Sequence, residues 1–423
     1  MKKYRVLATA LAAVAFLAGC GGGGAGNQNP RVAFTQMVNF GDSLSDVGSY
    51  KTTIVAANGV GKYSINGDLS SAGLLYTNWT EYLAATLKLT APCPAEVGLA
   101  SVGQLSFLAQ TPVDSTTCTS YAQGGAMVTN PYGPSNAYYY TTYHQSSGQL
   151  GQLTKPVAQQ VAAYLAAHTA FNDGQIVTVL AGGNDVLLNR ALTVDAQVAA
   201  VVAQQQAGTL TSAQAAAQIA TFATTAVAQM TLAGQQLATL INTQIIAKGA
   251  THVVVVNVPD ISRTPDAQAW VTTGAGVVVE PIHPHLTLDM ANAFNAALAT
   301  GMSVTTTNGV QSSSLSQVAW VDAFTQNDDQ LNEPSQYALT NVTTPACDLT
   351  KTGLTVPGVG LVPLASSLFC SKSTLITDSA NVTSTDPSGA LHYLFADTVH
   401  PTPYGYRLLA EFVAQKMALK GWL

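Results

Sequence analysis

Charged side chains are scarce in this chain. They make up 9% of its 423 residues, whereas soluble domains usually contain about 25%. The net charge is −6, and no block of Lys and Arg residues occurs. Because nucleic-acid binding requires a cationic face that neutralises phosphates, this composition argues against DNA or RNA as a partner. Apolar residues reach 47%, which allows a large core and is unlike the composition of a disordered chain.

Several motifs that would indicate other chemistry are also absent. The chain has no C-x-x-C pair and no H-E-x-x-H sequence, which are spacings typical of zinc sites. The nearest metal candidate is the pair His283 and His285, and it lacks a third ligand in the sequence. Glu280, three residues before His283, makes this histidine the nearest competitor for the role of a catalytic base that an acid orients. We therefore expect no metal and no organic cofactor. The G-x-S-x-G nucleophile elbow of the α/β-hydrolases is missing as well.

The N-terminus has the pattern of an export signal. Three basic residues in the first five positions precede the apolar stretch "VLATALAAVAFLAG", which is too short to span a bilayer comfortably. The sequence "LAGC", ending at Cys20, resembles the lipobox of bacterial lipoproteins, which implies lipidation of Cys20. We expect a signal peptide at 1–19, a flexible Gly-rich tether at 20–31, and a protein exported to the bacterial cell envelope, in or at the outer membrane. The alternative is an ordinary cleaved signal that happens to end near a cysteine.

The other four cysteines form two local pairs in the sequence: Cys93 with Cys118, and Cys347 with Cys370. An even number of cysteines in an exported protein indicates disulfides. In the loop-entropy model each such bridge contributes ~3 kcal/mol to stability. We therefore predict two disulfides that each close a short loop.

Apolar, β-branched runs alternate with helical patterns along the chain. Continuous apolar runs are typical of strands that are buried on both faces of a parallel sheet. The predicted strands lie at 31–40, 176–182, 252–259 and 317–324, and the clearest helices lie at 77–87, 155–168 and 404–421. This alternation predicts a three-layer α/β/α sandwich with a mostly parallel, flavodoxin-like sheet, formed by one domain at 32–423.

One segment of this domain, at about 191–248, is rich in Ala and Gln. No charged residue occurs between Asp195 and Lys248. Helix propensity is high, and the regular Gln residues weigh against a membrane span. We predict an insertion of two helices, broken near Gly208 and Thr209, that covers the site by packing on the core; binding of a ligand is the alternative. The tyrosines at 132–143 likewise either pack their own loop or contact a substrate.

Polar residues that suit acyl transfer follow the predicted strands. Ser43 lies in "FGDSLSDVG" directly after the first strand, and Asn184 follows Gly182 and Gly183 after the second. A nucleophilic serine requires a base, and the base requires an orienting group. Among the histidines, His400 has an aspartate three residues before it, Asp397 in "FADTVHPTPYG".

The order of these motifs resembles the GDSL, or SGNH, hydrolase family. The resemblance extends from about residue 34 to the C-terminus and includes "YAQGGAMV", "VNVPDISRTP" and "VDAFTQ", which are similar to its bacterial secreted lipase-like branch. It implies that Ser43 is the nucleophile, His400 the base and Asp397 its orienting acid. It also implies an oxyanion hole formed by the N–H groups of Ser43 and Gly124 and by the Asn184 amide, with the adjacent Gly125 as the alternative glycine.

This resemblance predicts a serine carboxylester hydrolase, either an esterase or a lipase that includes phospholipids among its substrates. The reaction would pass through an acyl-serine intermediate on a small-molecule or lipid ester, near a membrane to which the lipidated N-terminus anchors the protein. Deacetylation of a polysaccharide is the alternative within the family. A non-catalytic surface-binding lipoprotein is the alternative of another class, and the presence of Ser43, Asn184 and His400 argues against it.

Overall fold

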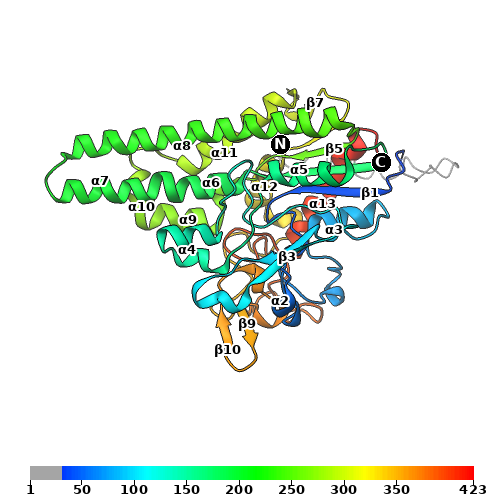
Figure 1. The fold of residues 1–423 in the computed structure, drawn as a ribbon, viewed down its shortest axis with the longest axis horizontal. Coiled ribbons are helices and arrows are strands. Elements are labelled where there is room, and N and C mark those ends of the chain that lie inside the picture. Colours follow the sequence, from blue (N-terminus) through cyan, green and yellow to red (C-terminus); the bar gives the residue numbers. More distant parts are fainter. Residues whose placement is uncertain (1–30) are drawn as a thin grey trace, which may run out of the picture.

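A computed structural model describes residues 31–423. At its centre lies a four-stranded parallel sheet in the order β1–β4–β5–β8 (Figure 1). The strands span Gln36–Gly41, Gln175–Leu180, Val253–Val256 and Val318–Val321. Each predicted strand region supplies one of them. The segment 119–123 runs beside β1, where Asn39 exchanges backbone hydrogen bonds with Thr119 and Tyr121.

Helices cover both faces of this sheet. Alternate strand residues such as Val177 and Val255 pack under α5 (Val157–His168), α8 (Ser212–Leu240) and α11 (Leu286–Gly301). The residues between them, such as Ile176 and Val254, pack under α3 (Trp79–Thr86) and α13 (Pro403–Leu419). Because both faces are buried, β5 and β8 are apolar throughout. Strands β1 and β4 are mostly apolar, and the buried Thr178 of β4 donates its hydroxyl to the side chain of Asn39 on β1 at 2.7 Å. The predicted three-layer α/β/α architecture is confirmed.

The helix starts follow from local sequence. Helix α3, within the predicted helix at 77–87, has Asn78 as its N-cap, in a capping box with Glu81. Helix α13 begins with Pro403 in its first turn, and the side chain of Thr402 accepts the N–H of Gly405. This cap fixes the entry of the chain from the loop that contains Asp397 and His400.

The Ala/Gln-rich insertion forms two helices, as predicted. Helix α7 (Ala196–Gln206) and α8 are separated by a break at 207–211, and both extend away from the sheet (Figure 1). Helix α6 (Gly183–Asn189) joins α7 through a π-helical turn, Arg190–Asp195. Among the residues that the structure describes, the stretch Gly183–Gln206 is the one helix long and apolar enough to span a membrane by length and composition, a test that core helices also pass.

The remaining elements form the edges and the region around the carboxyl ends of the strands. Three antiparallel hairpins are β2 (Glu96–Leu99) with β3 (Gln110–Asp114), β6 (Val304–Thr307) with β7 (Val310–Ser313), and β9 (Gly353–Val356) with β10 (Gly360–Pro363). The short helices are α2 (Thr53–Ala57), α4 (Ala137–Tyr143), α9 (Pro265–Thr272), α10 (Gly274–Val279) and α12 (Ala323–Asn332). Disulfides join Cys93 to Cys118 and Cys347 to Cys370, in the predicted pairing.

Candidate active site

The turn after β1 places Ser43 at the carboxyl edge of the sheet. Gly41 has φ +153°, and a Cβ at this position would lie 2.2 Å from the carbonyl oxygen of Leu180 on β4. The side chain of Gln160 on α5 fixes the same residue, since it accepts the N–H of Gly41 at 2.9 Å and donates to its carbonyl at 2.8 Å. The glycine therefore lets the chain turn sharply against β4, and Ser43 follows at a fixed position.

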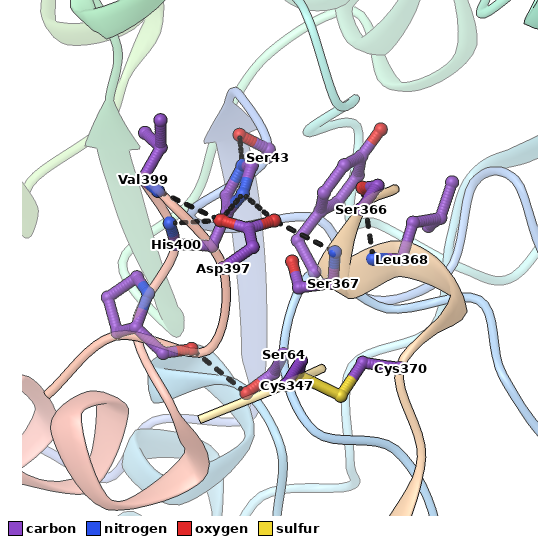
Figure 2. Close-up of polar contacts among 12 residues, drawn as sticks. Ser43, Ser64, Cys347, Ser366, Ser367, Leu368, Cys370, Asp397, Val399 and His400 are labelled. Carbon is purple, nitrogen blue, oxygen red and sulfur yellow. Dashed lines mark hydrogen bonds and ion pairs between the residues drawn. A yellow bond between two sulfur atoms is a disulfide. The ribbon is translucent and has the colours of Figure 1, made fainter. Parts of the chain in front are cut away.

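His400 reaches this serine from the loop that precedes α13. Its Nε2 lies 2.8 Å from the hydroxyl oxygen of Ser43, and its Nδ1 lies 2.9 Å and 3.0 Å from the two carboxylate oxygens of Asp397 (Figure 2). The three side chains thus form a continuous hydrogen-bonded chain, although Ser43 and His400 are 357 positions apart in the sequence. The first strand and the last helix of the domain thus place their neighbouring residues, Ser43 and His400, at the same edge of the sheet.

Backbone donors hold Asp397 in its ionised form. Its carboxylate accepts the N–H groups of Val399 at 2.9 Å, His400 at 2.7 Å and Ser367 at 2.8 Å. Burial by itself raises the pKa of this carboxyl, but the imidazole of His400 and these hydrogen bonds outweigh burial, and the pKa of Asp397 lies well below its usual range. The group therefore stays negatively charged beside the imidazole ring.

The pKa of His400 is shifted in the opposite direction. Burial of the ring opposes protonation, but the charge and hydrogen bond of Asp397, with a smaller contribution from Asp42, raise the pKa of His400 above 6.5. The ring of Tyr63 lies against the imidazole, with 4.7 Å between the ring centroids. The imidazole is thus held between a carboxylate and an aromatic ring, and its protonated form is stabilised.

The Cys347–Cys370 disulfide braces the segments on both sides of Asp397 (Figure 2). The N–H of Cys347 donates to the carbonyl of Ala396, directly before Asp397. The N–H of Cys370 donates to the carbonyl of Ser367, whose own N–H binds the Asp397 carboxylate. The disulfide therefore links the segment that is hydrogen-bonded to Ala396, directly before Asp397, to the turn whose Ser367 N–H binds the Asp397 carboxylate.

Asn184 lies in the first turn of α6, directly after β4. Gly182 has φ +119°, and a Cβ there would lie 2.4 Å from the ring of Phe294, so only glycine fits at this close approach. One amide hydrogen of Asn184 binds the carbonyl of Ala126 at 3.0 Å, and the side chain lines the same cavity as Ser43. The second amide hydrogen remains free to donate to a ligand in the cavity, because no other partner of this nitrogen occurs within residues 31–423.

The structure separates the two candidate glycines. The N–H of Gly124 donates to the carboxylate of Asp46 at 2.8 Å, and a Cβ on Gly124 would lie 2.2 Å from the hydroxyl of Tyr63. Gly125 lines the cavity beside Ser43. In the described part of the chain no hydrogen bond uses the N–H of Gly125. The N–H of Gly124 is therefore occupied by Asp46, whereas that of Gly125 has no partner within residues 31–423.

Two further buried carboxyls lie next to the nucleophile turn. Asp42 accepts the N–H of Leu44 at 3.0 Å, and Asp185 accepts the N–H of Val128 at 3.1 Å. Burial raises the pKa of each carboxyl to about 7. Their main contacts are with backbone N–H groups, so they shape the turns that carry Ser43 and Asn184.

These residues surround a cavity of about 490 Å³, which is within the size range of small-molecule sites. The side chains of Ser43, Asn184, Asp397 and His400 all line it. The other candidate histidines, His283 and His285, do not line the cavity. The Nδ1 atom of His283 lies 3.7 Å from a carboxylate oxygen of Asp289. Within residues 31–423 no group of three or more His, Cys, Asp or Glu side chains has the arrangement of a metal site.

Several residues at the site were not singled out from the sequence. Asp46 fixes the Gly124 turn, Ser367 donates to Asp397, and Tyr63 packs on His400. The one available signal was the position of Asp46 three residues after Ser43 in the same motif. Ser367 and Tyr63 carry no local pattern, because the contacts that matter come from distant segments.

At the carboxyl edge of the parallel sheet, a hydroxyl contacts an imidazole, and the imidazole contacts a buried carboxylate. This is the arrangement found in serine hydrolases. The family model described as GDSL-like lipase/acylhydrolase matches residues 37–413. The chain therefore belongs to the GDSL-like lipase/acylhydrolase family, and this membership indicates an enzyme that hydrolyses esters. No curated protein sequence matches the chain.

Proposed function

We propose that this protein is a serine carboxylester hydrolase that works through an acyl-serine intermediate. The observation that carries the proposal is the chain of contacts from Ser43 to His400 and Asp397, which opens into the cavity next to Asn184. The family membership supports the ester as the bond that is broken.

In the first half of the reaction, His400 Nε2 accepts the proton of Ser43 while the serine oxygen attacks the ester carbonyl. Asp397 holds the ring and stabilises the imidazolium that forms. His400 then donates the same proton to the alcohol oxygen as the carbon–oxygen bond breaks. In the second half, water gives a proton to His400 and attacks the acyl-serine, and the acid leaves as Ser43 recovers its hydrogen.

The negative oxygen of the tetrahedral intermediate requires hydrogen-bond donors at a fixed place. We assign this role to the N–H groups of Ser43 and Gly125 and to the amide of Asn184. Gly125 takes the place of Gly124, because the N–H of Gly124 is already bound to Asp46. The contacts of α6 with Ala126 and Val128 hold the Gly125 turn against the Asn184 side chain.

Covalent labelling tests the proposed mechanism directly. A fluorophosphonate probe is expected to add one group per molecule, on the peptide that contains Ser43, as measured by intact-mass and peptide mass spectrometry. Hydrolysis of p-nitrophenyl acetate should disappear in parallel with labelling. Absence of both labelling and hydrolysis would instead support the non-catalytic binding protein.

The oxyanion assignment predicts a separate effect for Asn184. Asn184→Ala is expected to lower kcat for p-nitrophenyl acetate by ~10²–10³-fold with little change in KM, because one donor to the transition state is lost. Asn189 is a matched control on the same helix: its buried amide also donates to a backbone carbonyl, that of Ala226 at 2.8 Å, but it does not line the cavity. Asn189→Ala should lower thermal stability and leave kcat within a few-fold. Equal kcat values for the two variants would show that Asn184 is not part of the oxyanion hole.

The disulfides indicate an exported protein, because such bridges persist in oxidising compartments. We propose in addition that Cys20 carries a lipid that anchors the enzyme to a membrane of the bacterial cell envelope. This residue and the predicted signal peptide lie outside the described residues, and the support for the anchor is the lipobox-like sequence.

A further inference from the structure

One face of α6 and of the π-helical turn after it lines the cavity beyond the catalytic residues. Apart from Gly183 and Arg190, the residues of these elements that line the cavity are Asn184, Leu187, Leu188, Ala191 and Leu192. Their spacing of three, four, seven and eight residues is that of a single helix face. A continuous wall that is apolar except at Asn184 therefore runs from the proposed oxyanion donor to the base of the Ala/Gln-rich insertion.

An aromatic residue and a second apolar segment face this wall. Leu188 packs with Tyr139 of α4 and with Met127, and Tyr139 itself lines the cavity. Val258 and Ile261, from the segment after β5, line it as well. These residues and the α6 wall line the apolar part of the cavity, which is called the slot below.

An ion pair between the buried Arg190 and the partly exposed Asp266 also lines the cavity, at the start of the π-helical turn. Arg190 donates to the carboxylate of Asp266 at 2.6 Å, and its guanidinium lies 5.1 Å from the ring centroid of Trp270. The other guanidinium nitrogens of Arg190 are buried and have no hydrogen-bond partner within residues 31–423. An alkyl chain that pushed this pair apart would leave the buried guanidinium of Arg190 without its carboxylate partner, which is costly.

The position of His400 decides which part of an ester enters the slot. The alcohol oxygen must lie near His400 to receive its proton. The loop that carries His400 leads into α13, which covers one face of the sheet, whereas Val186 of α6 packs in the core on the other face. The leaving alcohol is thus directed toward the His400 loop, and the acyl chain toward α6.

From these positions we infer that the acyl chain lies along α6 and that the preferred substrates are esters of medium-length fatty acids. This inference rests on the proposed ester hydrolysis. The six-residue step from Asn184 to Arg190 corresponds to about 9 Å along a helix, room for a chain of roughly six to eight carbon atoms. Longer chains must displace the Arg190–Asp266 pair or leave the slot.

A p-nitrophenyl ester series from acetate to dodecanoate tests this, since the leaving group is constant and only the acyl chain varies. We expect kcat/KM to rise at least tenfold from acetate to hexanoate or octanoate and to fall at least tenfold at dodecanoate. A value that rises continuously to dodecanoate, or that is highest for acetate, would overturn the inference. If the protein hydrolyses none of these esters, the proposed function fails instead.

Two substitutions on the wall locate the acyl chain. Ala191 lines the cavity yet is exposed, so Ala191→Phe adds bulk there without overpacking the core. It is expected to lower the octanoate-to-acetate ratio of kcat/KM at least tenfold. Leu192→Ala should raise the dodecanoate-to-octanoate ratio several-fold.

The matched control is Ala200→Phe, an equally exposed alanine on α7 that does not line the cavity. It should leave the chain-length profile unchanged. If Ala191→Phe lowers acetate and octanoate hydrolysis equally, or if Ala200→Phe changes the profile as much as Ala191→Phe, the acyl chain does not lie along α6. Thermal unfolding of each variant shows that the compared proteins are folded.

Discussion

Replacement of Ser43 by alanine is expected to lower ester turnover by at least ~10³-fold, because it removes the hydroxyl that contacts His400 and that would carry the acyl group. Ser43 is buried at the floor of the cavity, and its hydroxyl contacts the imidazole of His400 at 2.8 Å. The turn around it is fixed by the Gln160 side chain, which accepts the N–H of Gly41, and by the Asp42 carboxylate, which accepts the N–H of Leu44. The substitution should therefore leave the fold and the thermal stability nearly unchanged, as measured by circular dichroism and unfolding.

Ser45 provides the control for this experiment. It lies two residues further along and is also buried, but its hydroxyl accepts the indole N–H of Trp79 at 3.2 Å and does not line the cavity. Ser45→Ala should cost ~1 kcal/mol of stability for the lost hydrogen bond and keep esterase activity. Activity retained by purified Ser43→Ala protein, free of host esterase, would show that the nucleophile has been assigned wrongly.

The sequence predicted the sheet well because burial on both faces leaves a clear pattern. The run "HVVVVNVP" could not be the exposed strand of an antiparallel sheet, since it has no polar alternation, and it forms β5 at the centre. Helix bounds were also predictable, since the helix predicted at 77–87 is α3 (Trp79–Thr86), because helix ends depend on capping residues next to them in the sequence. Both properties are local, and local sequence therefore suffices for them.

The finer geometry of the site was not predictable in this way. Gly124 and Gly125 are equivalent in the sequence, and the contact that separates them is a hydrogen bond to Asp46, 78 positions away. The donation from Ser367 to Asp397 likewise depends on a loop that the Cys347–Cys370 bridge holds in place. The first residues of the predicted insertion, Ala191 and Leu192, line the cavity. Their placement depends on the π-helical turn at Arg190–Asp195, which no sequence pattern indicates.

The pH dependence of activity should reveal the charges around His400. Only the neutral imidazole accepts the serine proton, so kcat/KM should rise with pH through the pKa of His400. That pKa is raised in the folded protein, chiefly by Asp397 against the effect of burial. The midpoint of the rise is therefore expected above the ordinary histidine value of ~6.5. A midpoint well below that value would contradict the predicted effect of Asp397.

Substitutions of the three groups should separate their roles. His400→Ala is expected to be nearly as damaging as Ser43→Ala, and the double variant no worse than either single one, because the two residues act as a unit. Asp397→Asn should lower kcat by ~10²–10⁴-fold and move the midpoint of its residual activity to lower pH, since the carboxylate that raises the pKa of His400 is gone. Asp42→Asn should move the midpoint in the same direction by less, because Asp42 contributes less to that pKa. If Asp42→Asn moves the midpoint more than Asp397→Asn, or if His283→Ala is inactive while His400→Ala is active, the base has been assigned to the wrong residue.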